Sequence, residues 1–269
     1  MDKLISIIMG IYNCADTLDE AIQSILSQTY DNWEMIMCDD GSTDDTYSIA
    51  KKYVDLYPEK FILLKNEKNL GLNQTLNNCL SVSRGYYIAR MDGDDISYPE
   101  RFEEEIRAFN KNPDISIVST DMEFFDENGV WGRTKKYYRP DNSHFMKSNP
   151  FCHAPCLVKK EAFDNVDGYT VSEKLLRVED YHLWVKMYEA GYIGLNIQKP
   201  LYMMRDNREA QQRRKFRFRL NAAYSKAYAV KHLKLPVYNY IYCLTPIIKG
   251  ILPSFIYKFL HRHKLSARD

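Results

Sequence analysis

The chain alternates short apolar runs with segments of helical periodicity, and this alternation constrains its fold more than any other feature. Residues 4–11 (LISIIMGI) are short, rich in β-branched side chains and apolar throughout, as expected of a strand that is buried on both faces. Thr17 and Glu20 then match a capping box, and apolar residues recur behind them at helical spacing. The start of the chain therefore predicts a strand followed by a helix.

The same order of strand and helix recurs over the first 120 residues. The predicted strands are 33–38, 61–65, 86–91 and 115–120, and the predicted helices between them are 43–56, 72–83 and a segment that starts at Pro99. This alternation predicts an α/β fold in which helices cover both faces of a mostly parallel sheet. Ligands of such sheets bind outside the carboxyl ends of the strands.

Length and charge indicate one large domain with an appendage. A chain of 269 residues is long enough for a single α/β domain with a full core. Residues 205–269 hold 15 Lys/Arg and 3 Asp/Glu, a balance of +12, which leaves 22 and 33, or −11, for residues 1–204. We therefore expect an acidic catalytic domain over residues 1–205 and a basic, helical extension over 206–269, whose charge suggests an anionic partner.

The cysteines and the N-terminus favour the reducing cytosol. The six cysteines show no paired CxxC spacing, which is typical of buried thiols rather than of a zinc site or a disulfide framework. Cys152 and Cys156 could share a metal, but no second Cys/His pair at zinc spacing accompanies them. The apolar run near the N-terminus lacks a small-residue cleavage site, so we interpret it as a strand and not as a signal peptide.

Two groups of carboxylates follow predicted strands, in CDDGSTDDT (38–46) and in ARMDGDD (89–95). Asp92, Asp94 and Asp95 could bind a divalent cation, because Mg²⁺ and Mn²⁺ prefer oxygen ligands. The competing interpretation is a solvated acidic turn that caps a helix. In the first group, Gly41 with Ser42 and Asp45 would explain a turn and a helix cap, which leaves Asp39 and Asp40 for a base imide or a ribose hydroxyl.

Five segments, in this order, resemble the inverting glycosyltransferases of family 2. They are SIIMGIYN, SILSQTYDNWEMIMCDDGSTDDT, NEKNLGLNQTLNNCL, RGYYIARMDGDDISYPERFE and VEDYHLWVKMYEAG, within residues 3–205. The resemblance implies the GT-A fold, which is a Rossmann-like sheet flanked by helices. It also implies transfer of a sugar from a nucleotide diphosphate donor.

On the donor side, the resemblance assigns roles to residues at the ends of three predicted strands. Gly10, Ile11 and Tyr12 match the loop that lies against the nucleotide base, and Asp40 matches the Asp that binds the base. Asp92 and Asp94 match the DxD motif, in which the first carboxylate lies near the ribose and the metal. The second coordinates the Mn²⁺ or Mg²⁺ that bridges the diphosphate, and the adjacent Asp95 could orient both.

Asp180 matches the general base of the family. An acceptor hydroxyl is a poor nucleophile at neutral pH, so a carboxylate must remove its proton as it attacks the anomeric carbon. Base and metal flank the donor sugar from opposite sides, and attack therefore inverts the anomeric configuration. The competing interpretation of Asp180 is a carboxylate that the dipole favours at a helix N-terminus.

Four more residues complete the predicted site. The resemblance places His153 near the acceptor, where the competing interpretation is a structural hydrogen bond, and Glu179 lies beside the base on the same side. Arg205 matches a basic residue near a loop that can close over the diphosphate. Asn207 stands where many relatives carry His, which leaves loop closure open.

The extension allows two interpretations. Residues 213–234 predict a basic helix, and residues 235–260 are aromatic-rich and interrupted by prolines. Basic residues ahead of an aromatic and aliphatic stretch are typical of segments that lie in a membrane interface, and the uncharged run 235–248 is too short to span a bilayer. The alternative is a helical cap packed on the catalytic domain. No nucleic-acid module is recognisable.

Together these features predict a metal-dependent, inverting glycosyltransferase that uses a UDP-sugar. The expected acceptor is a lipid-linked saccharide of a bacterial surface polysaccharide, and the expected location is the inner face of the cell membrane. A sugar-phosphate nucleotidyltransferase should carry a Gly-rich basic loop after the first strand, and a dehydrogenase a GxGxxG; neither is present. An inactive saccharide-binding protein of the same fold would have lost Asp92, Asp94 or Asp180, which this chain keeps.

Overall fold

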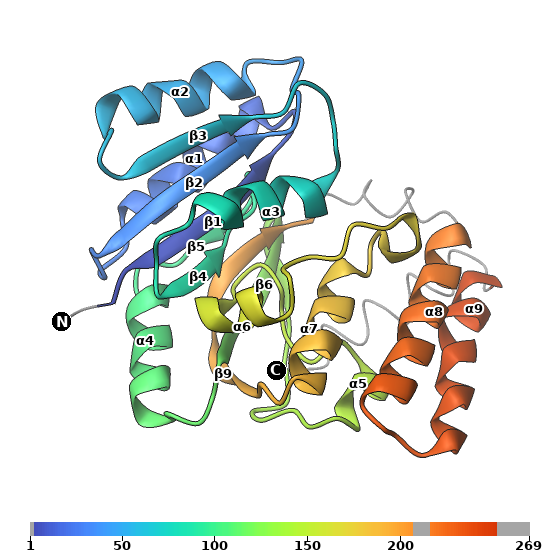
Figure 1. Cartoon of the computed structure of the whole chain (residues 1–269). Coiled ribbons are helices and arrows are strands. Elements are labelled where there is room, and N and C mark those ends of the chain that lie inside the picture. The colour runs from blue at the N-terminus through green and yellow to red at the C-terminus, as the bar shows by residue number, and fades with distance from the viewer. Residues whose placement is uncertain (1–2, 207–215, 252–269) are drawn as a thin grey trace.

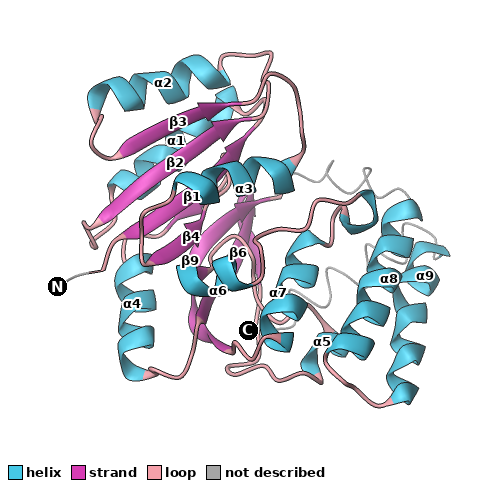
Figure 2. Ribbon diagram, in the orientation of Figure 1, coloured by secondary structure: helices cyan, strands magenta, loops and turns pink. Residues whose placement is uncertain are grey.

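One nine-stranded sheet runs through the part of the chain that the structure describes. This computed structural model describes residues 3–206 and 216–251. The strands are β1 Ile5–Ile11, β2 Trp33–Asp39, β3 Phe61–Lys65, β4 Tyr87–Arg90, β5 Ile96–Ser97, β6 Ile117–Asp126, β7 Gly129–Arg133, β8 Leu157–Lys159 and β9 Gly194–Arg205. Their order is β3-β2-β1-β4-β8-β6-β9-β5, and β7 pairs with β6 (Figures 1 and 2).

Most of the long strands are parallel, as predicted. β3, β2, β1 and β4 form a continuous parallel block, and β6 is parallel to β9. The short β8 lies antiparallel between β4 and β6, while β5 and β7 pair antiparallel with β9 and β6. The predicted bounds of β3 agree with the structure. The carboxyl ends of β1, β2 and β4 therefore meet at one edge of the sheet.

Helices cover both faces of this sheet. They are α1 Ala15–Leu26, α2 Thr46–Leu56, α3 Leu72–Val82, α4 Arg101–Lys111, α5 His144–Lys147, α6 Lys160–Asn165, α7 Glu179–Glu189, α8 Phe216–His232 and α9 Leu244–Ile251, with 3₁₀ turns η1 Glu173–Leu175 and η3 Val237–Cys243. Ile7 and Met9 of β1 pack in one apolar cluster with α1, α2 and α4. Ile8, between them, packs in a second cluster with α3, α6 and α7, because successive side chains of a strand alternate between faces.

Two predicted helix caps are wrong, because their side chains tie loops together instead. α1 begins at Ala15, and the Thr17 hydroxyl in its first turn donates to the Gly93 carbonyl (2.8 Å). Ser42 does not cap α2, since its hydroxyl accepts a hydrogen bond from the Asn13 amide (3.0 Å). The same polar residues thus connect the loops after β1, β2 and β4.

The basic helix predicted in the extension is present as α8, and it packs on the catalytic domain. Ala229 and Val230 share an apolar cluster with α7, and the Lys226 ammonium donates to the Met146 carbonyl (2.6 Å). Figure 1 shows α8 and α9 beside each other, next to α7. Within residues 3–206 and 216–251, no helix is long and apolar enough to cross a membrane. Asn207 and the ends of the predicted segments, 213–215 and 252–260, lie outside the described residues.

Candidate active site

Asp40, directly after β2, is fixed by the protein around it. Its amide donates to the Ile11 carbonyl (2.9 Å), which holds it against the end of β1. Its buried carboxylate accepts hydrogen bonds from Asn66 Nδ2 (2.8 Å) and from the amides of Leu70 (2.8 Å) and Gly71 (2.9 Å). Oδ1 takes two of these donors and Oδ2 one, so Oδ2 can accept another from a ligand N–H. Asp40 therefore orders the loop before α3 and can still bind a base.

The end of β1 places three predicted nucleotide contacts in different environments. A Cβ at Gly10 would lie 3.2 Å from Leu72 Cδ1, so the absence of a side chain here lets α3 approach the strand. Ile11 is fully buried, and its carbonyl accepts the hydrogen bond from the Asp40 amide. Tyr12 is 48% exposed and is available to a base. Their contacts with a nucleotide remain predictions.

The loop after β1 lies between the two carboxylate clusters. Asn13 adopts φ 49°, a left-handed conformation that Asn tolerates, and its Oδ1 accepts from the Thr43 amide (2.9 Å). On the other side, a Cβ at Gly93 would lie 2.9 Å from Cys14 Sγ, so any larger residue there would displace the Cys14 thiol. The two clusters are therefore brought together through the same short loop.

The cluster after β4 is less completely paired than Asp40. Asp92 Oδ1 forms an ion pair with Arg90 Nη2 (2.7 Å). Asp95 Oδ1 accepts from the Arg205 amide (2.8 Å), while its buried Oδ2 has no hydrogen-bond partner in the described parts of the chain. Burial, followed by the charge of Asp92, raises the pKa of Asp94 and raises that of Asp95 further. Asp94 is the exposed member of the three.

These carboxylates fit a divalent cation that arrives with a nucleotide diphosphate. Among residues 3–206 and 216–251, no group of three or more His, Cys, Asp or Glu side chains could hold a metal alone. Mg²⁺ commonly binds through one or two carboxylates and completes its shell with substrate phosphates and water. Asp94, exposed and beside Asp92, offers such an incomplete ligand set. Metal binding by Asp92 and Asp94 is consistent with this arrangement and remains a prediction.

Arg205, the last residue of β9, is brought to the same loop. Besides the amide that binds Asp95, its Nε donates to the Asp94 carbonyl (3.0 Å). Its guanidinium also pairs with Glu20 of α1 and lies 4.5 Å from the centroid of the Phe125 ring. This basic side chain thus borders the predicted diphosphate position, although it comes from 111 residues further along the chain.

Asp180 lies in the first turn of α7, with its carboxylate held by two donors. Asn149 Nδ2 donates to Oδ2, and the Tyr181 amide donates to Oδ1 (2.7 Å). Burial raises the pKa of Asp180, and burial together with the charge of Asp180 raises the pKa of Glu179. A carboxylate with a raised pKa is a stronger base than one in water, as proton abstraction requires.

Arg90 acts electrostatically both on the carboxylates after β4 and on Asp180. It was not among the site residues predicted from the sequence. It is 8% exposed at the end of β4, and its Nε has no partner among the described residues. Burial disfavours its charged form, but the negative charge of Asp92 raises the pKa of Arg90 above its ordinary value. Its charge in turn lowers the pKa of Asp94 and Asp180. The one signal in the sequence was an arginine inside an otherwise buried strand.

The family follows from comparison with known proteins. A family model described as glycosyl transferase family 2 matches residues 6–167. This chain belongs to that family. EpsE of Bacillus subtilis (strain 168), named as a glycosyltransferase, is 40% identical over 261 residues, which cover 97% of this chain and 94% of EpsE. The sugar-phosphate nucleotidyltransferase alternative is thereby excluded.

A further family 2 relative and two solved structures extend this comparison. WfgD of Escherichia coli, named as a UDP-Glc:α-D-GlcNAc-diphosphoundecaprenol β-1,3-glucosyltransferase, is 33% identical over 193 residues, or 72% of this chain and 73% of WfgD. Residues 1–349 of TarS of S. aureus, solved with UDP, superpose with TM-score 0.67 at 19% identity over 93% of this chain and 76% of that fragment. The mannosyltransferase PcManGT from Pyrobaculum calidifontis was solved with GDP-Man and Mn²⁺. It superposes with TM-score 0.63 at 16% identity over 95% of this chain and 77% of the PcManGT chain. The structural likenesses confirm the predicted GT-A-like fold.

His153 of this family 2 enzyme is held by contacts with two aromatic side chains. Its Nε2 shares a hydrogen bond with the Tyr169 hydroxyl (2.8 Å), and its ring packs edge-on against Trp184 (5.7 Å between centroids). Burial, and then the nearby charge of Arg90, hold the pKa of His153 well below its usual range. These contacts are those of a structural hydrogen bonder, and a contact with the acceptor remains a prediction.

Proposed function

We propose that this protein is a metal-dependent, inverting glycosyltransferase with Asp180 as its general base. The transferred sugar comes from a UDP-sugar and passes to a hydroxyl of a lipid-linked saccharide during synthesis of a bacterial surface polysaccharide. The observation that carries the proposal is the position of Arg90, whose charge acts on Asp92 and Asp94 on one side and on Asp180 on the other. Arg90 also forms an ion pair with Asp92 (2.7 Å), which supports the proposal that the DxD motif and the half-buried Asp180 serve one site.

Each part of the site then has a chemical task. Asp40 and the Gly10–Ile11–Tyr12 loop bind the nucleotide, and Asp92 and Asp94 would hold Mn²⁺ or Mg²⁺. The bound cation would stabilise the negative charge that develops on the departing diphosphate. Arg205 lies beside the DxD loop and adds a second positive charge there. On the opposite side, Asp180 removes the proton of the acceptor hydroxyl as it attacks the anomeric carbon, and the configuration inverts.

The comparisons support the choice of substrates. TarS was solved with UDP and PcManGT with GDP-Man and Mn²⁺, so nucleotide-diphosphate donors and a divalent metal occur on this fold. The name of WfgD gives a UDP-sugar donor and a lipid diphosphate acceptor. We infer the same classes of donor and acceptor for this chain, with residues 1–205 as the catalytic domain.

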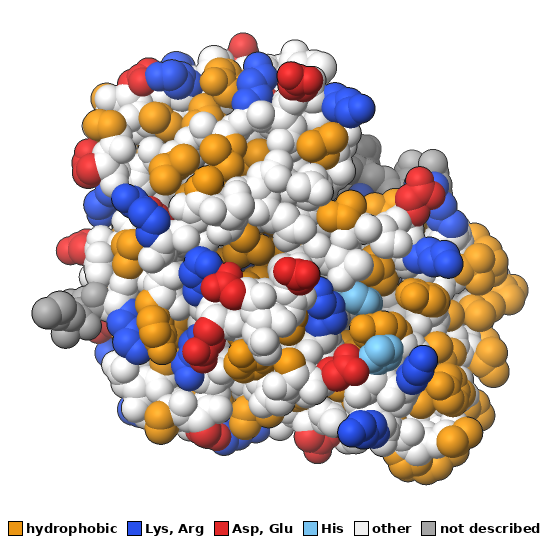
Figure 3. Space-filling view, in the orientation of Figure 1, with side chains coloured by type: hydrophobic (Ala, Val, Ile, Leu, Met, Phe, Trp, Pro, Cys, Tyr) orange, Lys and Arg blue, Asp and Glu red, His pale blue; other side chains and the backbone are white. Residues whose placement is uncertain are grey.

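A position on the inner face of the cell membrane is part of the proposal, with the 206–269 extension as the contact. Large apolar side chains of η3 and α9 face outward, including Val237 (79% exposed) and Ile251 (72% exposed). Figure 3 shows hydrophobic side chains gathered along the edge of the molecule that α8 and α9 form. Exposed apolar side chains beside basic residues are typical of surfaces that bind anionic membranes.

The proposal is tested by sugar transfer and by donor hydrolysis. Labelled UDP-sugars are incubated with Mn²⁺ and wild-type protein, Asp94→Asn or Asp180→Asn. We expect wild type to release UDP and both variants to lose most of this activity. Equal background rates in all three proteins would overturn the catalytic assignment and favour an inactive saccharide-binding protein.

A further inference from the structure

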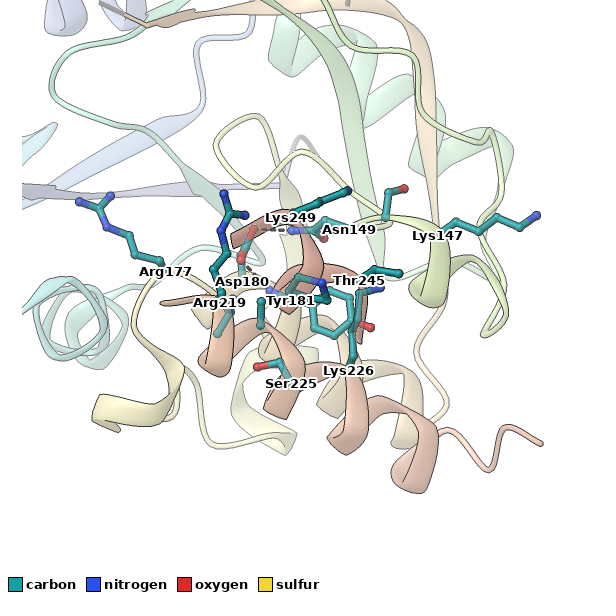
Figure 4. A pocket seen from close by; sticks show the side chains of 14 residues that line it. Lys147, Asn149, Arg177, Asp180, Tyr181, Arg219, Ser225, Lys226, Thr245 and Lys249 are labelled. Atoms are coloured by element: carbon teal, nitrogen blue, oxygen red, sulfur yellow. Dashed lines mark hydrogen bonds between the residues drawn. The ribbon is translucent and has the colours of Figure 1, made fainter. Parts of the chain in front are cut away.

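We propose that a cavity between α7 and the C-terminal helices binds a phosphate group of the acceptor. This inference rests on the proposed function and names the acceptor feature that the site recognises. The cavity has a volume of about 370 Å³ and lies against Asp180. Its walls come from four parts of the chain: the end of α5 with the segment after it, the start of α7, α8, and α9. Figure 4 shows it, with the Asp180–Asn149 hydrogen bond inside.

The charges around the cavity favour an anion. Five of its fourteen lining residues are basic and Asp180 alone is acidic; the basic ones are Lys147, Arg177, Arg219, Lys226 and Lys249. In Figure 4, Lys147 and Arg177 extend outward on opposite sides. Phosphate oxygens accept several charge-assisted hydrogen bonds at once, so a wall rich in basic side chains favours a phosphate ligand.

Two side chains of the wall, the buried Ser225 and the half-buried Lys226, support a polar ligand. Ser225 is 1% exposed, and its hydroxyl has no hydrogen-bond partner within the described parts of the chain. Burial lowers the pKa of Lys226 to about 8, and its ammonium has one described hydrogen-bond partner, the Met146 carbonyl. Buried polar groups are rarely left unpaired, so these groups indicate a ligand that accepts hydrogen bonds.

The cavity belongs to the acceptor rather than to the donor. Its lining includes the proposed base Asp180 but not Asp40, Asp92 or Asp94, which are proposed to bind the nucleotide diphosphate. A phosphate held here would bring the saccharide that it carries next to the base. The anion is therefore expected to be the phosphate or diphosphate that joins an acceptor saccharide to its carrier.

The outer surface of the same helices fits the lipid part of such an acceptor. Thr245 and Lys249 of α9 line the cavity, whereas Leu244, Ile248 and Ile251 of the same helix are exposed. The exposed apolar residues of η3 adjoin them; they are Val237, Tyr238, Tyr240, Ile241 and Tyr242. A polyisoprenoid chain that leaves the cavity would reach this apolar surface, where burial of its hydrocarbon is favourable.

The test is calorimetric binding of farnesyl diphosphate to the full chain in EDTA. Inorganic pyrophosphate supplies the phosphates without the lipid, and farnesol supplies the lipid without the phosphates. We expect farnesyl diphosphate to bind more tightly than either. Lys249→Gln should weaken its binding about tenfold, as expected for loss of one charged contact. Lys231→Gln, which removes the same charge from α8 outside the cavity, should leave the affinity within about twofold.

Different outcomes test the phosphate site and the lipid contact. Lys226→Gln should also weaken binding, and because it removes the hydrogen bond to Met146, its fold is checked by thermal unfolding; Lys249 is exposed and carries the test if Lys226→Gln unfolds. Equal affinities in Lys249→Gln and Lys231→Gln would overturn the phosphate site. Binding of pyrophosphate as tight as that of farnesyl diphosphate would overturn the lipid contact. The measurement needs neither metal nor turnover, so its failure is distinct from failure of the catalytic assignment.

Discussion

Two carboxylate clusters follow β2 and β4, the strands on either side of β1, but their surroundings in the fold differ. After β2, the Asp40 carboxylate accepts three hydrogen bonds from the loop that leads into α3. After β4, Asp94 is exposed, and the buried Asp95 Oδ2 has no hydrogen-bond partner among the described residues. Both clusters look alike in the sequence. The difference separates a carboxylate that is built into the fold from carboxylates that are left for a ligand.

Like the carboxylates after β4, Asp180 is proposed to act on a ligand and not to support the fold. Its loss should have the largest effect on activity. Asp180→Asn keeps the shape and one of the two acceptor oxygens but removes the base. We expect transfer to fall by about 10²–10⁴-fold, the range typical of general base catalysis, while UDP affinity is retained. Steady-state transfer and UDP titration measure the two effects.

The neighbouring carboxylate provides the control for that experiment. Glu179→Gln removes a charge from the same turn of α7 and leaves Asp180 in place. It should reduce transfer by less than about tenfold. A loss as large as that of Asp180→Asn would show that the base is not assigned correctly.

Arg90→Gln should change the pKa values of the carboxylates after β4 and leave the hydrogen bonds of Asp40 intact. The Arg90 charge lowers the pKa of Asp94, Glu179 and Asp180, so its removal raises all three. Asp180 must be deprotonated to act, and activity falls as pH drops through its pKa. The acidic limb of the pH–kcat/KM profile should therefore move to higher pH, with stability lowered on the order of 2 kcal/mol.

An arginine outside the site is the matched control. Arg84→Gln removes a salt bridge with Glu34 in which the Arg84 side chain is largely exposed. Its pH–kcat/KM profile should superimpose on that of wild type. If the profile moves as much as in Arg90→Gln, the shift reflects net charge and not the position of Arg90.

Asn149→Ala should give a smaller shift in the same direction. Its amide donates to Asp180 and lowers the pKa of that carboxyl, so the variant should raise it. The acidic limb should again move to higher pH, by less than in Arg90→Gln, because a neutral donor is replaced rather than a charge. Asn128→Ala, in the exposed turn between β6 and β7, should leave the profile unchanged.

The sequence predicted the parts of this site that local pattern determines. Apolar runs and turn residues locate β1 to β4 and place the carboxylates of the DxD motif after β4, whereas the Glu179-Asp180 pair was assigned through the resemblance to family 2. Arg90 was missed because its electrostatic effect on Glu179 and Asp180 depends on tertiary structure that brings distant parts of the chain near it. Thr17 was assigned to a cap because its bond to Gly93 is a tertiary contact. The cavity against Asp180 requires α8 and α9 to pack there, which no local pattern specifies.

The comparison of the two clusters is tested most directly by thermal unfolding of Asp40→Asn and Asp94→Asn, with Mn²⁺-dependent transfer measured on the same samples. Asp40→Asn places an amide N–H against the Gly71 amide and should cost about 2 kcal/mol, or roughly 4–8 °C in Tm. Asp94→Asn should unfold no earlier than wild type and lose transfer. An Asp94→Asn protein that melts as early as Asp40→Asn and keeps its transfer activity would contradict the account.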